Sequence, residues 1–225
     1  MLSCPFVRLP NEALTKFLAL AQVRVYSADV IFIHQGDEDA GVFVVRSGLV
    51  KLFYNTPGGK IITAGVYGPG TIIGLKEVLL ESAYELNAVA LKQTEVEYIQ
   101  RPDFTVILQN NPRLAIALLT KLSLEAQETA AQLLAVSGAL PLAARLMHKL
   151  EQLASICSHP TSGGIKIDLP LTVQELADML GCSRQWASKL LKDLEEVGMI
   201  SRRGASITLT LRELPASKAA SGSPR

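Results

Sequence analysis

Short hydrophobic runs separated by glycine-rich turns dominate residues 23–99. β-branched and aromatic side chains fill the runs, whereas Gly, Pro, Asp and Ser fill the segments between them, which is the pattern of strands and turns. The strands expected are Val30–His34, Val42–Arg46, Leu49–Tyr54, Lys60–Val66, Thr71–Ile73, Leu86–Ala90 and Glu95–Ile99. Their spacing predicts an antiparallel sandwich or jelly-roll barrel, preceded by a short helix over Asn11–Leu20.

After Pro102 the hydrophobic period changes from two residues to about 3.5. Asn111 and Pro112 mark the start of a helix, because proline is tolerated in a first helical turn. One apolar stripe, expected to pack on the barrel, is Leu114, Leu118 and Leu122. A second stripe, mostly of small residues, is Ile116, Leu119, Ser123, Ala126, Ala130 and Leu133. Two apolar faces predict that the helix pairs with a second copy; the alternative is a helix that only caps its own domain.

Residues 171–195 carry the most informative pattern, two short amphipathic helices joined by a tight turn. Thr172 and Glu175 have the spacing of a capping box, and Ser183 is suited to cap the second helix. Gly181 is suited to the left-handed residue that ends the first helix. These signals together predict a helix-turn-helix; the alternative is an ordinary αα-hairpin with a solvated basic face.

The outward face of the second helix has the chemistry of a major-groove reader. Arg can bond guanine, Gln adenine, and Lys guanine or phosphate, and the N-terminal residues of such a helix reach base edges. A β-hairpin wing over residues 199–211 brings further arginines toward the DNA backbone. The candidate DNA-binding residues are Thr172, Ser183, Arg184, Gln185, Ser188, Lys189, Arg202 and Arg203.

Gly138 is expected to end the long helix, and Pro141 to begin the next one. We therefore predict a sensor domain over residues 1–110, a dimerisation helix over 111–137, a winged helix-turn-helix over 138–215, and a disordered tail over 216–225. Residues 159–164 read as a soft connecting segment.

The net charge of +1 is an average over unlike parts. Residues 1–140 hold 11 basic and 13 acidic residues, whereas residues 141–225 hold 11 and 8. The basic excess therefore lies in the part predicted to bind DNA.

Composition excludes several classes of protein. With 225 residues, 48% hydrophobic and 19% charged, the chain is globular rather than disordered. No apolar run approaches the length of a membrane span, and Met1–Pro10 lacks the pattern of a signal peptide. Cys4, Cys157 and Cys182 are odd in number and form no C-x-x-C pair, which argues against a disulfide framework or a metal site and favours a reduced cytoplasm.

The helix-turn-helix resembles the recognition-helix signature of the Crp/Fnr family of bacterial transcription regulators. Further regions of resemblance, to the family's β-roll and long helix, are His34–Gly36, Val44–Leu52, Gly70–Gly74 and Asn111–Pro112. The resemblance covers roughly residues 20–212. It implies an α+β fold, in which a cyclic-nucleotide-type barrel is joined by a dimer helix to a winged helix-turn-helix, and it implies contact with RNA polymerase.

The effector cassette departs from the members of that family that bind cyclic AMP. Those members use a glutamate for the ribose and an Arg-Ser pair for the cyclic phosphate; here Leu75 replaces the glutamate, and Leu86 and Asn87 replace the pair. A buried phosphate without a bidentate cation loses its main contact, so we do not expect cyclic AMP to bind. The candidate pocket residues are Ile73, Gly74, Leu75, Leu86, Asn87, Thr129 and Ala130. An apolar effector, a carboxylate effector, or a filled and silent pocket all remain open.

The sequence also argues against other cofactors and other functions. Haem is not expected because His34 is the only histidine of the barrel, and the family's iron–sulfur sensor needs four cysteines. A jelly-roll enzyme needs two or three histidines with a carboxylate, and no hydrolase, zinc-protease or phosphate-loop motif is present. A regulatory module that acts on a protein partner has no need of a capped recognition helix. We therefore predict a non-enzymatic homodimer on double-stranded DNA, with recognition helices about 34 Å apart on an inverted repeat.

Overall fold

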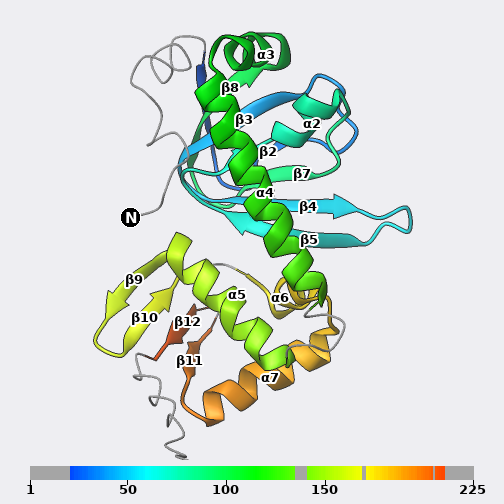
Figure 1. The fold of residues 1–225 in the computed structure, drawn as a ribbon. Coiled ribbons are helices and arrows are strands. Elements are labelled where there is room, and N and C mark those ends of the chain that lie inside the picture. Colours follow the sequence, from blue (N-terminus) through cyan, green and yellow to red (C-terminus); the bar gives the residue numbers. More distant parts are fainter. Residues whose placement is uncertain (1–20, 135–140, 169–170, 205, 211–225) are drawn as a thin grey trace, which may run out of the picture.

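The computed structural model describes residues 21–134, 141–168, 171–204 and 206–210. A β-roll and a smaller C-terminal head lie one above the other, and helix α4 (Pro112–Leu134) runs along the β-roll toward the head (Figure 1). The expected helix over 11–20, the expected boundary at Gly138 and the expected tail over 216–225 lie outside these residues. No helix in the described ranges is both long enough and apolar enough to cross a membrane.

The β-roll consists of two four-stranded antiparallel sheets, in the orders β1-β8-β3-β6 and β2-β7-β4-β5. The strands are β1 (Gln22–Tyr26), β2 (Ile31–Ile33), β3 (Gly41–Ser47), β4 (Val50–Asn55), β5 (Ile61–Tyr67), β6 (Ile72–Ile73), β7 (Asn87–Ala90) and β8 (Thr94–Gln100). Inward-facing residues of both sheets, such as Ile33, Val42, Ala88 and Val96, form one hydrophobic core. The antiparallel sheet architecture predicted from the sequence is thus confirmed.

Three elements of the β-roll lack a clear sequence signal. Strand β1 pairs along its whole length with β8, but Val23 and Val25 are exposed, so hydrophobic alternation marks no buried face there. Helix α2 (Leu75–Leu80) is only six residues long. Helix α3 (Arg101–Asn110) begins with Pro102 in its first turn and buries Phe104 and Ile107.

Helix α4 has two faces of different character. Leu114 and Leu118 are buried in the β-roll core, and Leu122 packs against it, as the first stripe predicts. On the other face Ile116 and Leu119 are 63% and 60% exposed, and the remaining exposed stripe residues are Ser123, Ala126 and Ala130. The side chain of Leu133 lies outside the described set.

The head combines three helices with a four-stranded sheet in the order β11-β12-β10-β9. Its elements are α5 (Leu142–Ile156), β9 (Ser158–Thr161), β10 (Gly164–Ile167), α6 (Val173–Leu180), α7 (Arg184–Glu196), β11 (Ile200–Arg203) and β12 (Ser206–Leu209). Leu146, Leu150 and Leu153 of α5 are buried, as their spacing predicts. The expectation of a soft segment over 159–164 was wrong: these residues form the β9–β10 hairpin, whose outer strand is exposed throughout and therefore carries no hydrophobic pattern.

Candidate DNA interface and effector cavity

Side-chain caps fix the geometry of the helix-turn-helix formed by α6 and α7. The Thr172 hydroxyl accepts a hydrogen bond from the backbone N–H of Glu175 at 3.2 Å, and Glu175 Oε2 accepts one from the backbone N–H of Thr172 at 2.8 Å. Gly181 ends α6 with φ of 65°, in the left-handed region that favours glycine. Ser183 Oγ then accepts from the N–H of Trp186 at 3.3 Å and starts α7. The predicted capping box and second cap are confirmed.

Helix α7 presents polar side chains on the face away from its packing. Ala187, Leu190, Leu191 and Leu194 are buried in the head. The exposed residues of the opposite face are Arg184, Gln185, Ser188, Lys189 and Lys192. Helix α6 contacts both β5 and α7, and α7 lies farther from the β-roll than α6 does (Figure 1). The candidate base-reading residues are therefore together and accessible.

Besides Ser183, which caps α7, two other candidates are already engaged in structural contacts. Thr172 uses its hydroxyl within the capping box, where it also donates to Glu175 Oε2 at 2.9 Å. Arg202 reaches from β11 to Glu195 of α7, with Nε and Nη2 at 3.1 and 3.0 Å from Oε2. The Arg202 guanidinium holds the pKa of Glu195 below its usual range. The structure thus makes Arg202 a strut between wing and α7, and leaves Arg203 exposed beside the turn of the wing.

Sequence reasoning did not select Trp186, which lies in the first turn of α7. Its side chain is large and apolar, yet the residue is 53% exposed. Lys189 Nζ lies 5.2 Å from the centre of its ring. Helical spacing could have predicted that Trp186 is exposed, because position 186 does not belong to the buried face formed by positions 187, 190, 191 and 194.

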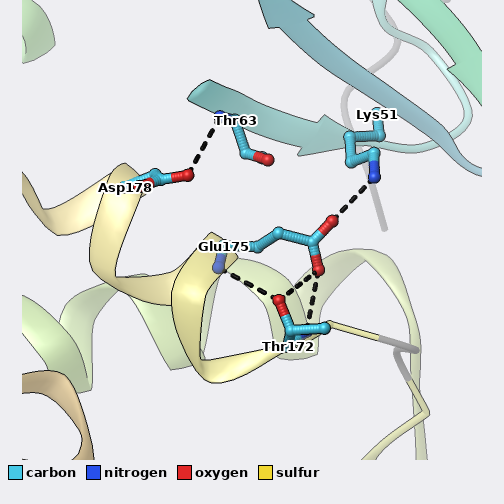
Figure 2. A network of polar contacts seen from close by, with 5 residues as sticks. All are labelled: Lys51, Thr63, Thr172, Glu175 and Asp178. Carbon is cyan, nitrogen blue, oxygen red and sulfur yellow. Dashed lines mark hydrogen bonds and ion pairs between the residues drawn. The ribbon is translucent and has the colours of Figure 1, made fainter. Parts of the chain in front are cut away.

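A polar clamp joins the head to the β-roll (Figure 2). Lys51 Nζ of β4 lies 2.7 Å from Glu175 Oε1 of α6, and the Thr63 N–H of β5 points to Asp178 Oδ2 at 3.5 Å. The Lys51 and Glu175 side chains are only 21% and 16% exposed. Burial alone raises the pKa of Glu175, but the hydrogen bonds from Lys51 and Thr172 outweigh it, so the pKa lies below its usual value.

Apolar packing accompanies the clamp. Leu49 and Val66 of the β-roll belong to the same hydrophobic cluster as Leu150 and Leu153 of α5. Gly68 leaves room for Ile156, since a Cβ at position 68 would overlap that side chain. The head is therefore seated on the β-roll by both polar and apolar contacts.

A cavity of about 560 Å³ lies where the β-roll, α4, α5 and α6 meet. Four predicted pocket residues, Ile73, Gly74, Leu75 and Leu86, line it. The lining residues that come from α4 and the head are Leu122, Lys149, Gln152, Leu153, Ser155, Ile156 and Met179. Asn87 is instead buried in the sheet, where it accepts from the Gln35 N–H at 3.0 Å, and Ala130 is exposed on α4. The Thr129 side chain lies outside the described set.

Comparison with known proteins agrees with both parts of this architecture. Residues 23–111 match the family model of the cyclic nucleotide-binding domain, and residues 143–214 match that of the Crp-like helix-turn-helix domain. The first match covers the β-roll and the second the head. The chain belongs to the Crp/Fnr family.

Relatives of this Crp/Fnr protein are similar over nearly their whole length. The CRP-like protein Clp of Xanthomonas campestris pv. campestris is 26% identical over 216 residues, which cover 91% of each chain. The cAMP-activated global transcriptional regulator CRP of Haemophilus influenzae is 27% identical over 203 residues, which cover 88% of each. The solved structure of the c-di-GMP-responsive global regulator CLP of Xanthomonas campestris has a TM-score of 0.72 and 25% identity, and the match covers 89% of this chain and 99% of that one.

This Crp/Fnr protein is accordingly a transcription regulator with a helix-turn-helix DNA-binding domain. The family consists of transcription regulators rather than enzymes. The β-roll above the head is the part that corresponds to the family's cyclic nucleotide-binding domain.

The cavity does not fit a cyclic phosphate. No arginine occurs among its described lining residues, and Leu86 places an apolar side chain in its wall. Lys76 is hydrogen-bonded to Glu85 and lies 3.6 Å from Glu77, so its charge is already compensated. Partial burial works against the charged form, yet these two carboxylates raise the pKa of Lys76 above its ordinary value. The cations among the described lining residues are Lys76 and Lys149, and a lysine cannot offer a phosphate the bidentate contact of an arginine.

We predict that Lys51→Met loosens the seating of the head without unfolding α6. The substitution removes the cationic partner of a partly buried carboxylate but keeps the capping box, so we expect a loss of about 1–3 kcal/mol in the free energy of unfolding. Urea unfolding measures that loss, and hydrogen exchange at the Thr63 amide reports the seating directly. Lys60→Met, on the exposed turn of the same hairpin, is the matched control. Equal behaviour of the two variants would contradict a role for the clamp.

The same contact predicts a pH dependence. Because the pKa of Glu175 is lowered in the folded protein, its contribution is fully present above the pKa of the unfolded chain, near 4.3. It is lost as pH falls through the folded-state pKa. The difference in stability between wild type and Glu175→Gln should therefore shrink below about pH 4; a constant difference down to pH 3 would oppose this assignment.

Proposed function

We propose that this protein is a homodimer that binds an inverted-repeat DNA site and regulates transcription in response to an effector in the β-roll. The observation that carries the proposal is the exposed face of α7, where Arg184, Gln185, Ser188 and Lys189 lie in the first half of a helix that Ser183 caps. The family likeness supports contact with RNA polymerase as the next step, and we expect a regulator of this kind to act in the cytoplasm.

The exposed stripe on α4 supports the dimer. Ile116 and Leu119 are large hydrophobic residues that are exposed to solvent, and the opposite face of their helix is already buried. Two such helices related by a two-fold axis would bury the stripe against itself. In this arrangement residues 1–110 are the sensor, residues 111–137 the dimer helix and residues 138–215 the DNA-binding domain, with two recognition helices available for two half-sites.

The cavity supports a response to an effector. Its walls come from the β-roll, from α4 and from α5 and α6 of the head, so a molecule bound in it would contact all three. A ligand with different affinities for two arrangements of these walls shifts the balance between them. The chemical class of the effector stays open, except that we do not expect cyclic AMP.

DNA binding is tested with Arg184→Ala. We expect a loss of about 1–3 kcal/mol of binding free energy at sites that carry one particular guanine in each half-site, and little change at sites that lack it. Affinities for duplexes selected from a random pool, each base pair varied in turn, measure this. Lys192→Ala is the comparison variant, because Lys192 is exposed about two turns farther along α7. It should weaken binding to all DNA sequences alike. The family members that bind cyclic AMP recognise the half-site TGTGA with an acidic residue and an arginine. Because Gln185 and Lys189 stand at the matching positions here, we expect a different half-site. If wild type selects no duplex at all, a module that acts on a protein partner becomes the better explanation.

The dimer is tested with Leu119→Lys, which places a charge in the exposed stripe of α4. We expect the variant to sediment as a monomer, because an unpaired charge is costly in an apolar interface. Leu124→Lys is the matched control, since Leu124 is also exposed on α4 but lies off the stripe. An unchanged mass for Leu119→Lys would move the interface elsewhere.

The cavity is tested by thermal unfolding with added nucleotides. Cyclic AMP should leave the Tm unchanged, because the described lining offers no arginine for its phosphate. We expect the same for cyclic di-GMP, the molecule to which the Xanthomonas CLP responds. A selected DNA duplex, which should raise the Tm, is the positive control. A rise with cyclic AMP comparable to that with DNA would refute the interpretation of the cassette.

A further inference from the structure

Trp186 is an anomaly on an otherwise polar surface. It occupies the first turn of α7, directly after Arg184 and Gln185, and more than half of its surface is exposed. Leaving a large indole in water forgoes the free energy that its burial would provide. The residue is also the only tryptophan of the chain. Its position, one turn before Lys189, puts it on the edge of the candidate base-reading face.

The charges around Trp186 indicate what covers it. Arg184 precedes it by two positions and Lys189 Nζ lies 5.2 Å from its ring, so an apolar protein surface docked here would have to desolvate two cations. The major groove of DNA meets both needs at once. Its phosphates attract the cations, and the C5-methyl group of thymine is an apolar target between them.

We propose that Trp186 is a specificity-determining residue that contacts a thymine methyl group in each half-site. The inference rests on the proposed DNA-binding function and adds a contact that the polar residues of α7 do not make. Arg184 and Gln185 recognise hydrogen-bond donors and acceptors, which leaves the methyl group unread. Trp186 supplies the apolar surface for it.

The test replaces thymine by uracil, which removes the methyl group and leaves the pairing edge intact. A duplex site is first selected from a random pool with wild-type protein, and each thymine of the half-site is then replaced symmetrically. At one position we expect wild-type affinity to fall about fourfold for each methyl group removed, the value of burying one such group. Trp186→Ala should bind the original site more weakly and lose the distinction between thymine and uracil there. Trp186→Phe should retain part of it.

Fluorescence of the single tryptophan gives an independent readout. Emission should shift to shorter wavelength when the selected duplex is added, because the indole leaves water; Arg184→Ala controls for weaker binding without loss of the indole. Circular dichroism shows whether Trp186→Ala remains folded, and wild-type protein on uracil-substituted DNA tests the proposal without any variant. If wild type binds DNA but no uracil substitution matters, the thymine contact is refuted while the proposed function stands. If wild type selects no duplex, the proposed function fails and this inference with it.

Discussion

The seating of α6 on the β-roll is the contact on which the arrangement of this molecule depends. Helix α6 touches β5 on one side and α7 on the other, so the recognition helix inherits its orientation from that contact. The partly buried ion pair between Lys51 and Glu175 orients α6 on the β-roll, and the apolar cluster around Leu49 and Val66 adds buried hydrophobic surface to the contact. The two kinds of contact respond differently to their surroundings, since charge pairs weaken with salt and acid whereas apolar contacts do not.

Local chemistry explains which features could be predicted from the sequence. The caps at Thr172 and Ser183 are predictable because a cap is decided within four residues by the hydrogen bonds of one side chain. The strands of the β-roll core are predictable because the inner faces of the two sheets enclose one apolar interior, which leaves a hydrophobic pattern in the sequence. Strands β1 and β9 are not, since their side chains remain largely in water and leave no periodic signal.

Long-range pairing explains what the sequence could not provide. Lys51 and Glu175 are 124 positions apart, and neither carries a local signature of its partner. Arg202 illustrates the same limit, because a guanidinium suits a phosphate and a carboxylate equally well, and only the fold shows that Glu195 is within reach. The cavity is a third case. Its apolar wall at Leu86 could be inferred, but not that residues of α5 line its other side. The fold does not by itself fix which ligand such a cavity accepts, because ligand choice depends on the residues that line it.

The strut between Arg202 and Glu195 has a consequence for how this head meets a double helix. The side chain of Arg202 donates two hydrogen bonds to the Glu195 carboxylate and its backbone N–H donates a third, so the protein itself sets the distance between the wing and α7, the two surfaces that we propose bind DNA. Adjustment to an imperfect fit then falls to the DNA, through the width of its grooves and its resistance to bending. Base pairs that no side chain reaches would thereby contribute to the choice of site, through the stiffness of the duplex alone.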